Sequence, residues 1–136
     1  MMFKGTTKYP ADTFIKLIAD NGGQQNAMTT QDYTVYYQEL SNDKLALSFK
    51  LEADRMQHLV LSEKDFNSEL KVVQEERKMR VDNDPIMLTY ERYNAAAYLN
   101  SPYRNPGAGW ASDLHQFTLE DLKQWYSTWY VPNNAT

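Results

Sequence analysis

The sequence contains no cysteine, which excludes a disulfide-stabilised scaffold and any zinc site built on thiolates. It has no apolar run that approaches the ~18 residues of a membrane span, so no membrane-spanning helix is expected. Positive charge is in deficit, with 14 Lys and Arg against 18 Asp and Glu and a formal net charge of −4. Because nucleic-acid binding needs clustered positive charge, nucleic acid is not an expected partner.

The remaining composition is that of a folded protein. The 136 residues leave room for one domain, and 13% aromatic residues provide apolar surface to bury. The first residues lack the continuous apolar segment of a signal peptide. The last residues include Pro132-Asn133-Asn134, a turn sequence that belongs either to a short tail or to a larger fold.

The first third of the chain predicts a helix followed by a hairpin. The helix is expected to start near Pro10, which suits a first helical turn, and to end at Gly22-Gly23. The next stretch is rich in β-branched and aromatic residues, most clearly at 33–37. It predicts a hairpin with arms near 24–29 and 33–40.

Helical spacing dominates the centre of the chain. Ser41-Asn42-Asp43 is expected to cap a second helix whose amphipathic stripe consists of Leu45, Phe49, Ala53, Met56 and Val60. Ser62 with Asp65 approximates a capping box for a third helix, which is expected to run to about Asp82.

Two further helices are predicted after a break at Asn83-Asp84-Pro85. The fourth helix runs through Ala97, residues 100–117 form a loop, and Thr118 caps a last helix. Most aromatic side chains of the hairpin and the last helix are expected to pack in the core, because aromatic residues at such spacing usually do. These residues are Tyr33, Tyr36, Tyr37, Trp125 and Trp129.

The third helix carries two carboxylates on its apolar side. With Glu69 set to zero on a wheel of ~100° per residue, Glu76 falls at about −20°, near Val73 at about +40°. The two acids therefore lie two turns apart in the apolar arc, whereas Glu75 falls outside it. A buried carboxylate must be protonated, paired with a cation or bound to a metal.

Two interpretations of these acids remain open from spacing alone. Arg80 lies four residues after Glu76 and Arg77 lies on the same side, so a structural salt bridge is one of them. A metal or catalytic role is the other, although one glutamate cannot hold zinc. The two histidines, His58 and His115, lack metal-binding spacing and are expected to have structural or surface roles. No nucleotide-binding loop or nucleophile motif is present.

Several short motifs follow one another in a fixed order: Met2-Phe3-Lys4-Gly5-Thr6, Gly22-Gly23, Asn26-Ala27-Met28-Thr29, Thr34-Val35-Tyr36-Tyr37, Glu69 with Val73 and Glu75-Glu76, Ser101-Pro102-Tyr103, Gly109-Trp110, and Trp125-Tyr126 with 129–135. In this order they resemble the insulinase-like zinc peptidases, the superfamily of pitrilysin and the mitochondrial processing peptidase. The resemblance covers essentially the whole chain and is greatest for bacterial two-domain members, which are typically periplasmic.

The resemblance assigns roles to particular residues. It implies that Glu76 is the third ligand of a zinc ion and that Glu69 is a supporting carboxylate. It also implies that Asn26 and Ala27 belong to a strand that pairs with the backbone of a peptide substrate. The sequence does not contain H-x-x-E-H, the inverzincin motif that supplies the two histidine ligands and the general base. No catalytic residue is therefore expected within this chain, and tight zinc binding is not expected.

The resemblance also implies the fold and the partners. We expect an α+β fold, a truncated insulinase-like domain in which a small antiparallel sheet packs on four or five helices. Residues 1–136 would then begin just after the zinc motif and end before the closing strands. The absent zinc-motif helix and a second domain would be partners, and exposed edges favour a homo-oligomer.

Two functions remain. The first is a fragment of a zinc-dependent metalloendopeptidase, inactive as this isolated chain. The second is a non-catalytic peptide-binding or scaffold protein of the same fold. A helical interaction module unrelated to either is a third alternative.

Overall fold

The only sheet is a two-stranded hairpin, close to the predicted boundaries. In the computed structural model, which describes residues 1–136, β1 (Gln24–Thr29) pairs antiparallel with β2 (Thr34–Glu39). Glycine is favoured just before β1, because a Cβ on Gly23 would lie 2.7 Å from the main-chain oxygen of Glu39. The predicted hairpin is therefore confirmed.

The first three helices follow the sequence signals, with one shifted start. Helix α1 (Thr13–Asp20) begins after Pro10 because Pro10 pairs with Gly5 in an isolated β-bridge. A short 3-10 helix (Asn42–Lys44) precedes α2 (Leu45–His58), so the expected cap at Ser41-Asn42-Asp43 is wrong: Lys44 is the N-cap of α2, and no side chain caps it. Helix α3 (Glu63–Arg77) is capped by Ser62, whose hydroxyl accepts a 3.1 Å bond from the Asp65 amide. It continues as a π-helical segment, Lys78–Asp82, so the predicted end near Asp82 is confirmed.

The second half contains one helix more than predicted. Helix α4 (Pro85–Ala97) follows the expected break and is capped by Asp84, and the expected cap Thr118 forms a capping box with Asp121 at the start of α6 (Leu119–Trp129). The segment 100–117 is not wholly a loop, because it contains a short 3-10 helix at Pro102–Arg104 and α5 (Ala111–Gln116). The last element is a 3-10 helix at Pro132–Asn134. None of the helices combines the length and apolar character needed to cross a membrane.

The apolar core is small. Only 8 of 136 residues are buried, and one cluster of Phe14, Ile18 and Leu51 forms the core between α1 and α2. The predicted stripe of α2 is not the covered face, because Phe49 is 67% exposed and Leu45 is 57% exposed. The face that carries Leu51 and Arg55 is buried instead.

Most of the aromatic residues assigned to the core are exposed. Trp125 and Trp129 stack on each other, with ring centroids 5.6 Å apart, yet each keeps about half of its surface accessible. Tyr33 and Tyr37 are exposed as well, and only Tyr36 is half-buried. The expectation of an aromatic core is therefore wrong for four of these five residues, because no other element of the chain covers them.

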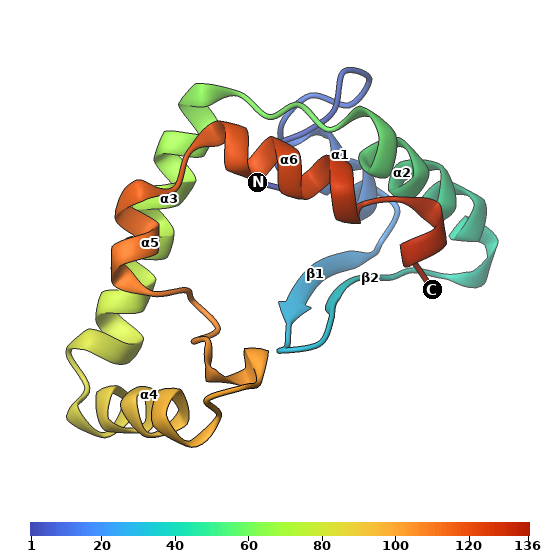
Figure 1. The fold of residues 1–136 in the computed structure, drawn as a ribbon. Coiled ribbons are helices and arrows are strands. Elements are labelled where there is room, and N and C mark those ends of the chain that lie inside the picture. Colours follow the sequence, from blue (N-terminus) through green and yellow to red (C-terminus); the bar gives the residue numbers. More distant parts are fainter.

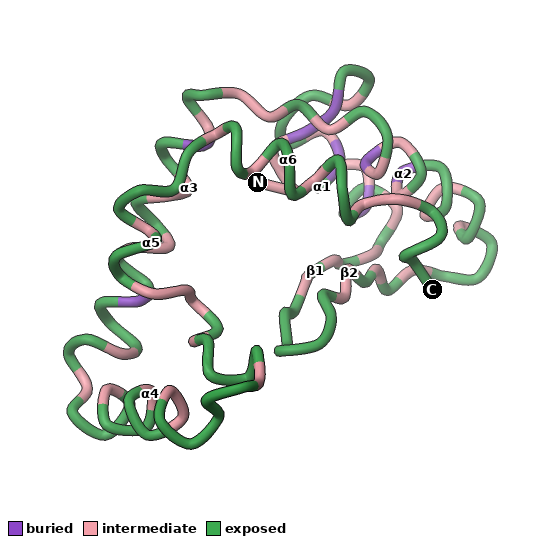
Figure 2. The backbone as a smooth tube through the Cα atoms, in the orientation of Figure 1, coloured by how far each residue is buried: buried purple, intermediate pink, exposed green.

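The elements follow an open arch (Figure 1). The hairpin lies near α1 and α2 at one end, α3 forms the opposite side, and α4 lies at the far end. Buried positions are few: most lie where the N-terminal segment, α1 and α2 meet, and the others lie on α3 (Figure 2). The hairpin turn meets the far end through one contact, in which the Tyr103 hydroxyl donates a 2.7 Å hydrogen bond to Asp32.

Replacing Ser62 by Ala should destabilise the chain by about 1 kcal/mol, because the first turn of α3 loses the acceptor for the Asp65 amide. Ser62→Thr keeps a hydroxyl at this position and is the matched control. Urea denaturation followed by circular dichroism measures both variants. Equal midpoints for Ser62→Ala and the unsubstituted chain would contradict this role of the cap.

Candidate functional site

Glu69 lies in the middle of α3 and is half-buried. Its carboxylate is 3.0 Å from the Lys4 ammonium and 3.7 Å from the Met1 amino group. The hydrogen bond to Glu69 raises the pKa of Lys4. The acid also borders a mainly apolar pocket of about 270 Å³, whose other lining residues are Met1, Phe66, Leu70, Val73, Leu114, Phe117 and Leu122. Glu69 is therefore a paired carboxylate at the edge of an apolar pocket.

Glu76 lies two turns further along α3 and is accessible. Its side chain is 46% exposed and lies 3.0 Å from the Arg80 guanidinium. The expectation that it is buried on the inner face is wrong, because the covered side of α3 is occupied by Phe66 and Arg77. The salt bridge to Arg80, one of the two interpretations of the spacing, is the interaction present. Glu69 and Glu76 line different pockets.

Asn26 and Ala27 lie on a strand with one free edge. β1 has β2 as its only strand neighbour, and Ala27 is paired with Tyr36. The side-chain oxygen of Asn26 accepts a 2.8 Å hydrogen bond from the Ala27 amide. No hydrogen bond or ion pair connects these residues with Glu69 or Glu76. The free edge can accept another strand, because β1 presents main-chain groups there.

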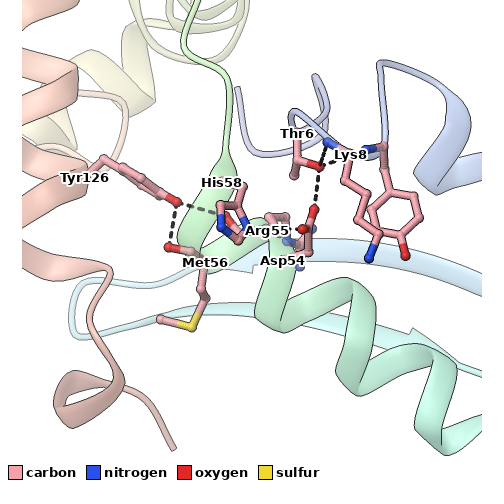
Figure 3. Close-up of polar contacts among 8 residues, drawn as sticks. Thr6, Lys8, Asp54, Arg55, Met56, His58 and Tyr126 are labelled. Atoms are coloured by element: carbon pink, nitrogen blue, oxygen red, sulfur yellow. Dashed lines mark hydrogen bonds and ion pairs between the residues drawn. The ribbon is translucent and has the colours of Figure 1, made fainter.

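A polar cluster ties the N-terminal segment to the end of α2 (Figure 3). The buried Thr6 hydroxyl donates to Asp54, and His58 Nδ1 lies 3.1 Å from the other carboxylate oxygen of Asp54. In a nucleophilic triad the histidine lies between hydroxyl and acid, so that it can take the proton. Here the acid lies between them, so the cluster does not activate Thr6. The contacts of the cluster join the N-terminal segment to α2.

Two buried arginines are the main features that sequence reasoning missed. Arg77, 5% exposed, forms a bidentate pair with Glu91 at 2.8 and 2.9 Å and donates to the Gly109 carbonyl at 2.7 Å. That hydrogen bond to Glu91 raises the pKa of Arg77. Sequence reasoning considered Arg77 only as a partner of Glu76. Its place at about +80° on the wheel, inside the apolar arc, was the available signal.

Arg55 is the second buried arginine, with 2% of its surface exposed. Its guanidinium carbon lies 4.5 Å from the ring centre of Tyr36, 5.1 Å from that of Phe14 and 5.3 Å from that of Phe3. Its charge is paired with Glu52, one turn earlier in α2. The signal for this burial was its position four residues after Leu51, on the same face of the helix.

Comparison with known proteins decides the family. Residues 1–109 match the model of the insulinase family, peptidase family M16. The chain belongs to this family. It is 39% identical over 133 residues to the zinc protease PqqE of Helicobacter pylori, an alignment that covers 98% of this chain and 30% of that protein.

Solved structures agree with this assignment to the M16 family. The crystal structure of a protease from Helicobacter pylori superposes with a TM-score of 0.90 at 37% identity, covering 98% of this chain and 32% of that one. A putative M16-like peptidase from Alicyclobacillus acidocaldarius gives a TM-score of 0.80 at 26% identity, covering 98% and 30%. The α+β fold expected from the sequence is thereby confirmed. The chain spans about a third of the length of these relatives.

The donor set of this M16 chain does not by itself form a zinc site. Among residues 1–136 there is no group of three or more His, Cys, Asp or Glu side chains that could hold a metal ion. Catalytic zinc needs three protein ligands and an open position. Glu76 offers one accessible carboxylate, a ligand type that zinc accepts, and it would have to leave Arg80 to bind.

Two glutamates with opposite environments should respond differently to loss of charge. Glu91→Gln should cost about 3 kcal/mol of stability, because the buried Arg77 loses its bidentate ionic partner and keeps only the more exposed Asp82, at 3.2 Å. Glu76→Gln should cost less than about 1 kcal/mol, because its pair with Arg80 is exposed. Urea denaturation of both variants provides the measurement. A larger loss of stability for Glu76→Gln than for Glu91→Gln would contradict the assignment of Glu91 to a buried ion pair and of Glu76 to an exposed one.

Proposed function

We propose that this chain is part of a zinc-dependent metalloendopeptidase of the M16 family that hydrolyses peptides. The observation that carries the proposal is the family match over residues 1–109, supported by the 39% identity to a zinc protease. Zinc bound in such an enzyme supplies an activated water for attack on the peptide bond. The isolated chain is inactive in this proposal, because its sequence contains neither the two histidine ligands nor the general base of H-x-x-E-H.

Glu76 is assigned as one metal ligand, and Glu69 as the carboxylate that supports the site. Accessibility of Glu76 supports its role, since a ligand must be reachable by groups outside α3. Glu69 already binds the N-terminal segment through Lys4, so it can fix that segment relative to α3. The remaining ligands would come from outside residues 1–136, from a zinc-motif helix.

The free edge of β1 is assigned as the peptide-binding edge. A substrate in extended conformation would add there as a further strand, with main-chain hydrogen bonds near Asn26 and Ala27. Main-chain pairing does not depend on particular side chains of the peptide, which suits an endopeptidase of broad specificity. The Ala27 amide would exchange its bond to the Asn26 side chain for one to the peptide.

The setting of the parent enzyme is proposed from its relatives. Residues 1–136 would form part of a first peptidase domain, with the zinc-motif helix and a second domain as partners. A periplasmic location fits the resemblance to exported bacterial members. An E. coli protein described as the periplasmic protease PqqL has a similar fold, at a TM-score of 0.80 and 23% identity.

A non-catalytic peptide-binding or scaffold protein of the same fold is the second candidate. The salt bridge between Glu76 and Arg80 favours it, because a metal ion would have to displace this partner. A scaffold would keep the free β1 edge and bind peptide without cleaving it. The two candidates therefore differ in zinc binding and hydrolysis, not in peptide pairing.

The purified chain should bind zinc weakly and should cleave no peptide, because one carboxylate cannot hold a catalytic ion. Zinc titration calorimetry and a fluorogenic peptide assay test both statements. Tight stoichiometric zinc binding, or hydrolysis that a chelator abolishes, would contradict the proposal that residues 1–136 supply only one ligand of the zinc site.

A complementation experiment tests Glu76 directly. A synthetic helix that carries H-x-x-E-H is mixed with the chain, and zinc affinity of the mixture is measured. Glu76→Gln should lower that affinity by at least about tenfold. Glu75→Gln, a neighbouring glutamate that is 70% exposed, should leave it unchanged. Equal effects of the two substitutions, or zinc affinity no higher than that of the synthetic helix alone, would overturn the ligand role of Glu76 and favour the scaffold.

The chain should self-associate at high concentration, because it exposes many large apolar side chains and an unpaired strand edge. Multi-angle light scattering over a concentration series measures the mass. Phe49→Ser, which removes a side chain that is 67% exposed, should reduce the association. A constant monomer mass up to millimolar concentration would contradict the expectation.

A further inference from the structure

We propose that Arg55 is a positioning residue for peptide binding: from α2 it supports Tyr36 and thereby holds β1 in the orientation in which its free edge accepts a peptide backbone. This inference rests on the proposed function, which assigns the free edge of β1 as the peptide-binding edge. Arg55 itself does not touch the peptide in this proposal. It acts through Tyr36, the residue of β2 that is paired with Ala27.

Arg55 lies where three segments of the chain meet. The rings around its guanidinium come from the N-terminal segment, α1 and β2, and belong to Phe3, Phe14 and Tyr36. A cation over several aromatic faces is attracted by each of them, and the attraction is stronger where water is excluded. At 2% exposure the guanidinium has little access to solvent. The charge therefore holds β2 against the core at the centre of the hairpin.

The hydroxyl groups of three tyrosines extend this support to α6. The Tyr36 hydroxyl lies 2.7 Å from that of Tyr130, at the C-terminal end of α6. The Tyr126 hydroxyl donates to the main-chain carbonyls of Arg55 at 2.8 Å and Met56 at 2.7 Å (Figure 3). The same residue, Arg55, is thus fixed by α6 through its backbone while its side chain supports β2.

A polar contact holds the strand at a second point. Gln38 of β2 donates to Glu52, and Glu52 is the ionic partner of Arg55. Gln38 is paired across the hairpin with Gln25, the residue before Asn26. Tyr36 and Gln38 are two residues apart on one strand, so their side chains lie on the same face. That face is turned toward α2, and Arg55 contacts it directly through Tyr36 and indirectly through Glu52.

The exposure of the hairpin explains why it needs the support of Arg55. Its other large side chains point away from the core, with Tyr33 55% exposed, Met28 50% exposed and Tyr37 40% exposed. A two-stranded hairpin is at best marginally stable without packing on another element. Without Arg55 the strands could remain paired and still change their angle to α2. Peptide affinity would fall because the edge would have to be ordered upon binding.

The test uses the full chain and a short labelled peptide of alternating Thr and Val, with binding measured by fluorescence anisotropy. Arg55→Met keeps an unbranched side chain but removes the charge, and it should lower peptide affinity by about tenfold. Arg77→Met is the matched control, because it removes the other buried arginine at a distance from the hairpin. It should leave peptide affinity within about twofold of the unsubstituted chain.

Two measurements separate positioning from general stability. Amide hydrogen exchange should become faster in residues 24–39 for Arg55→Met, with unchanged rates in α3 and α4. At position 36, Tyr36→Phe keeps the ring under the guanidinium and loses only the hydrogen bond to Tyr130, so it should lose less affinity than Tyr36→Leu, which should lose about tenfold. This rescue by the conservative variant stays informative if Arg55→Met fails to fold.

Each other outcome overturns a defined statement. Peptide binding that is unchanged in both Arg55→Met and Tyr36→Leu overturns the role of Arg55, as do equal losses in Arg55→Met and Arg77→Met. The same peptide with N-methylated backbone amides should not bind to the unsubstituted chain. Absence of any peptide binding by the unsubstituted chain overturns the proposed function itself, together with this role, and is thereby distinguished from a failure of Arg55 alone.

Discussion

The burial of two arginines is the interaction on which most of this structure depends. The apolar cluster contains only three buried side chains, so apolar burial alone orders little of the chain. A buried guanidinium is costly unless its charge and its donors are satisfied. Arg77 meets most of this requirement with Glu91 and a main-chain carbonyl, and Arg55 meets it in part with Glu52 and aromatic faces, while Nε of Arg77 and Nη1 of Arg55 have no hydrogen-bond partner. One arginine orders the α3–α4 end of the arch, and the other orders the hairpin end.

Local signals in the sequence predicted most of the elements. Ser62 and Thr118 were each assigned as helix-capping residues, and each side chain accepts the expected backbone hydrogen bond. The hairpin arms also matched, because both the break at Gly22-Gly23 and the β-branched run at 33–37 act over a few residues. Helix α5 was missed because six residues carry too little periodicity to be distinguished from a loop.

Features that depend on distant contacts could not be predicted in the same way. A helical wheel identifies an apolar stripe but not the element that covers it, which is why the stripe through Phe49 is accessible and the opposite face of α2 is buried. The same reasoning placed Glu76 inside, although Phe66 and Arg77 occupy the covered side of α3. The family was recognised because it depends on the order of motifs, which distant contacts do not change.

An exposed hydrogen bond between Asp32 and Tyr103 joins the two ends of the arch. Its partners lie 71 residues apart in the sequence, so this bond joins the hairpin turn to the segment after α4. Both partners are exposed, so water can replace each of them when the bond breaks. When this bond is open, the distance between the hairpin turn and the segment after α4 can change by hinge motion, which occurs in proteins on the microsecond-to-millisecond timescale.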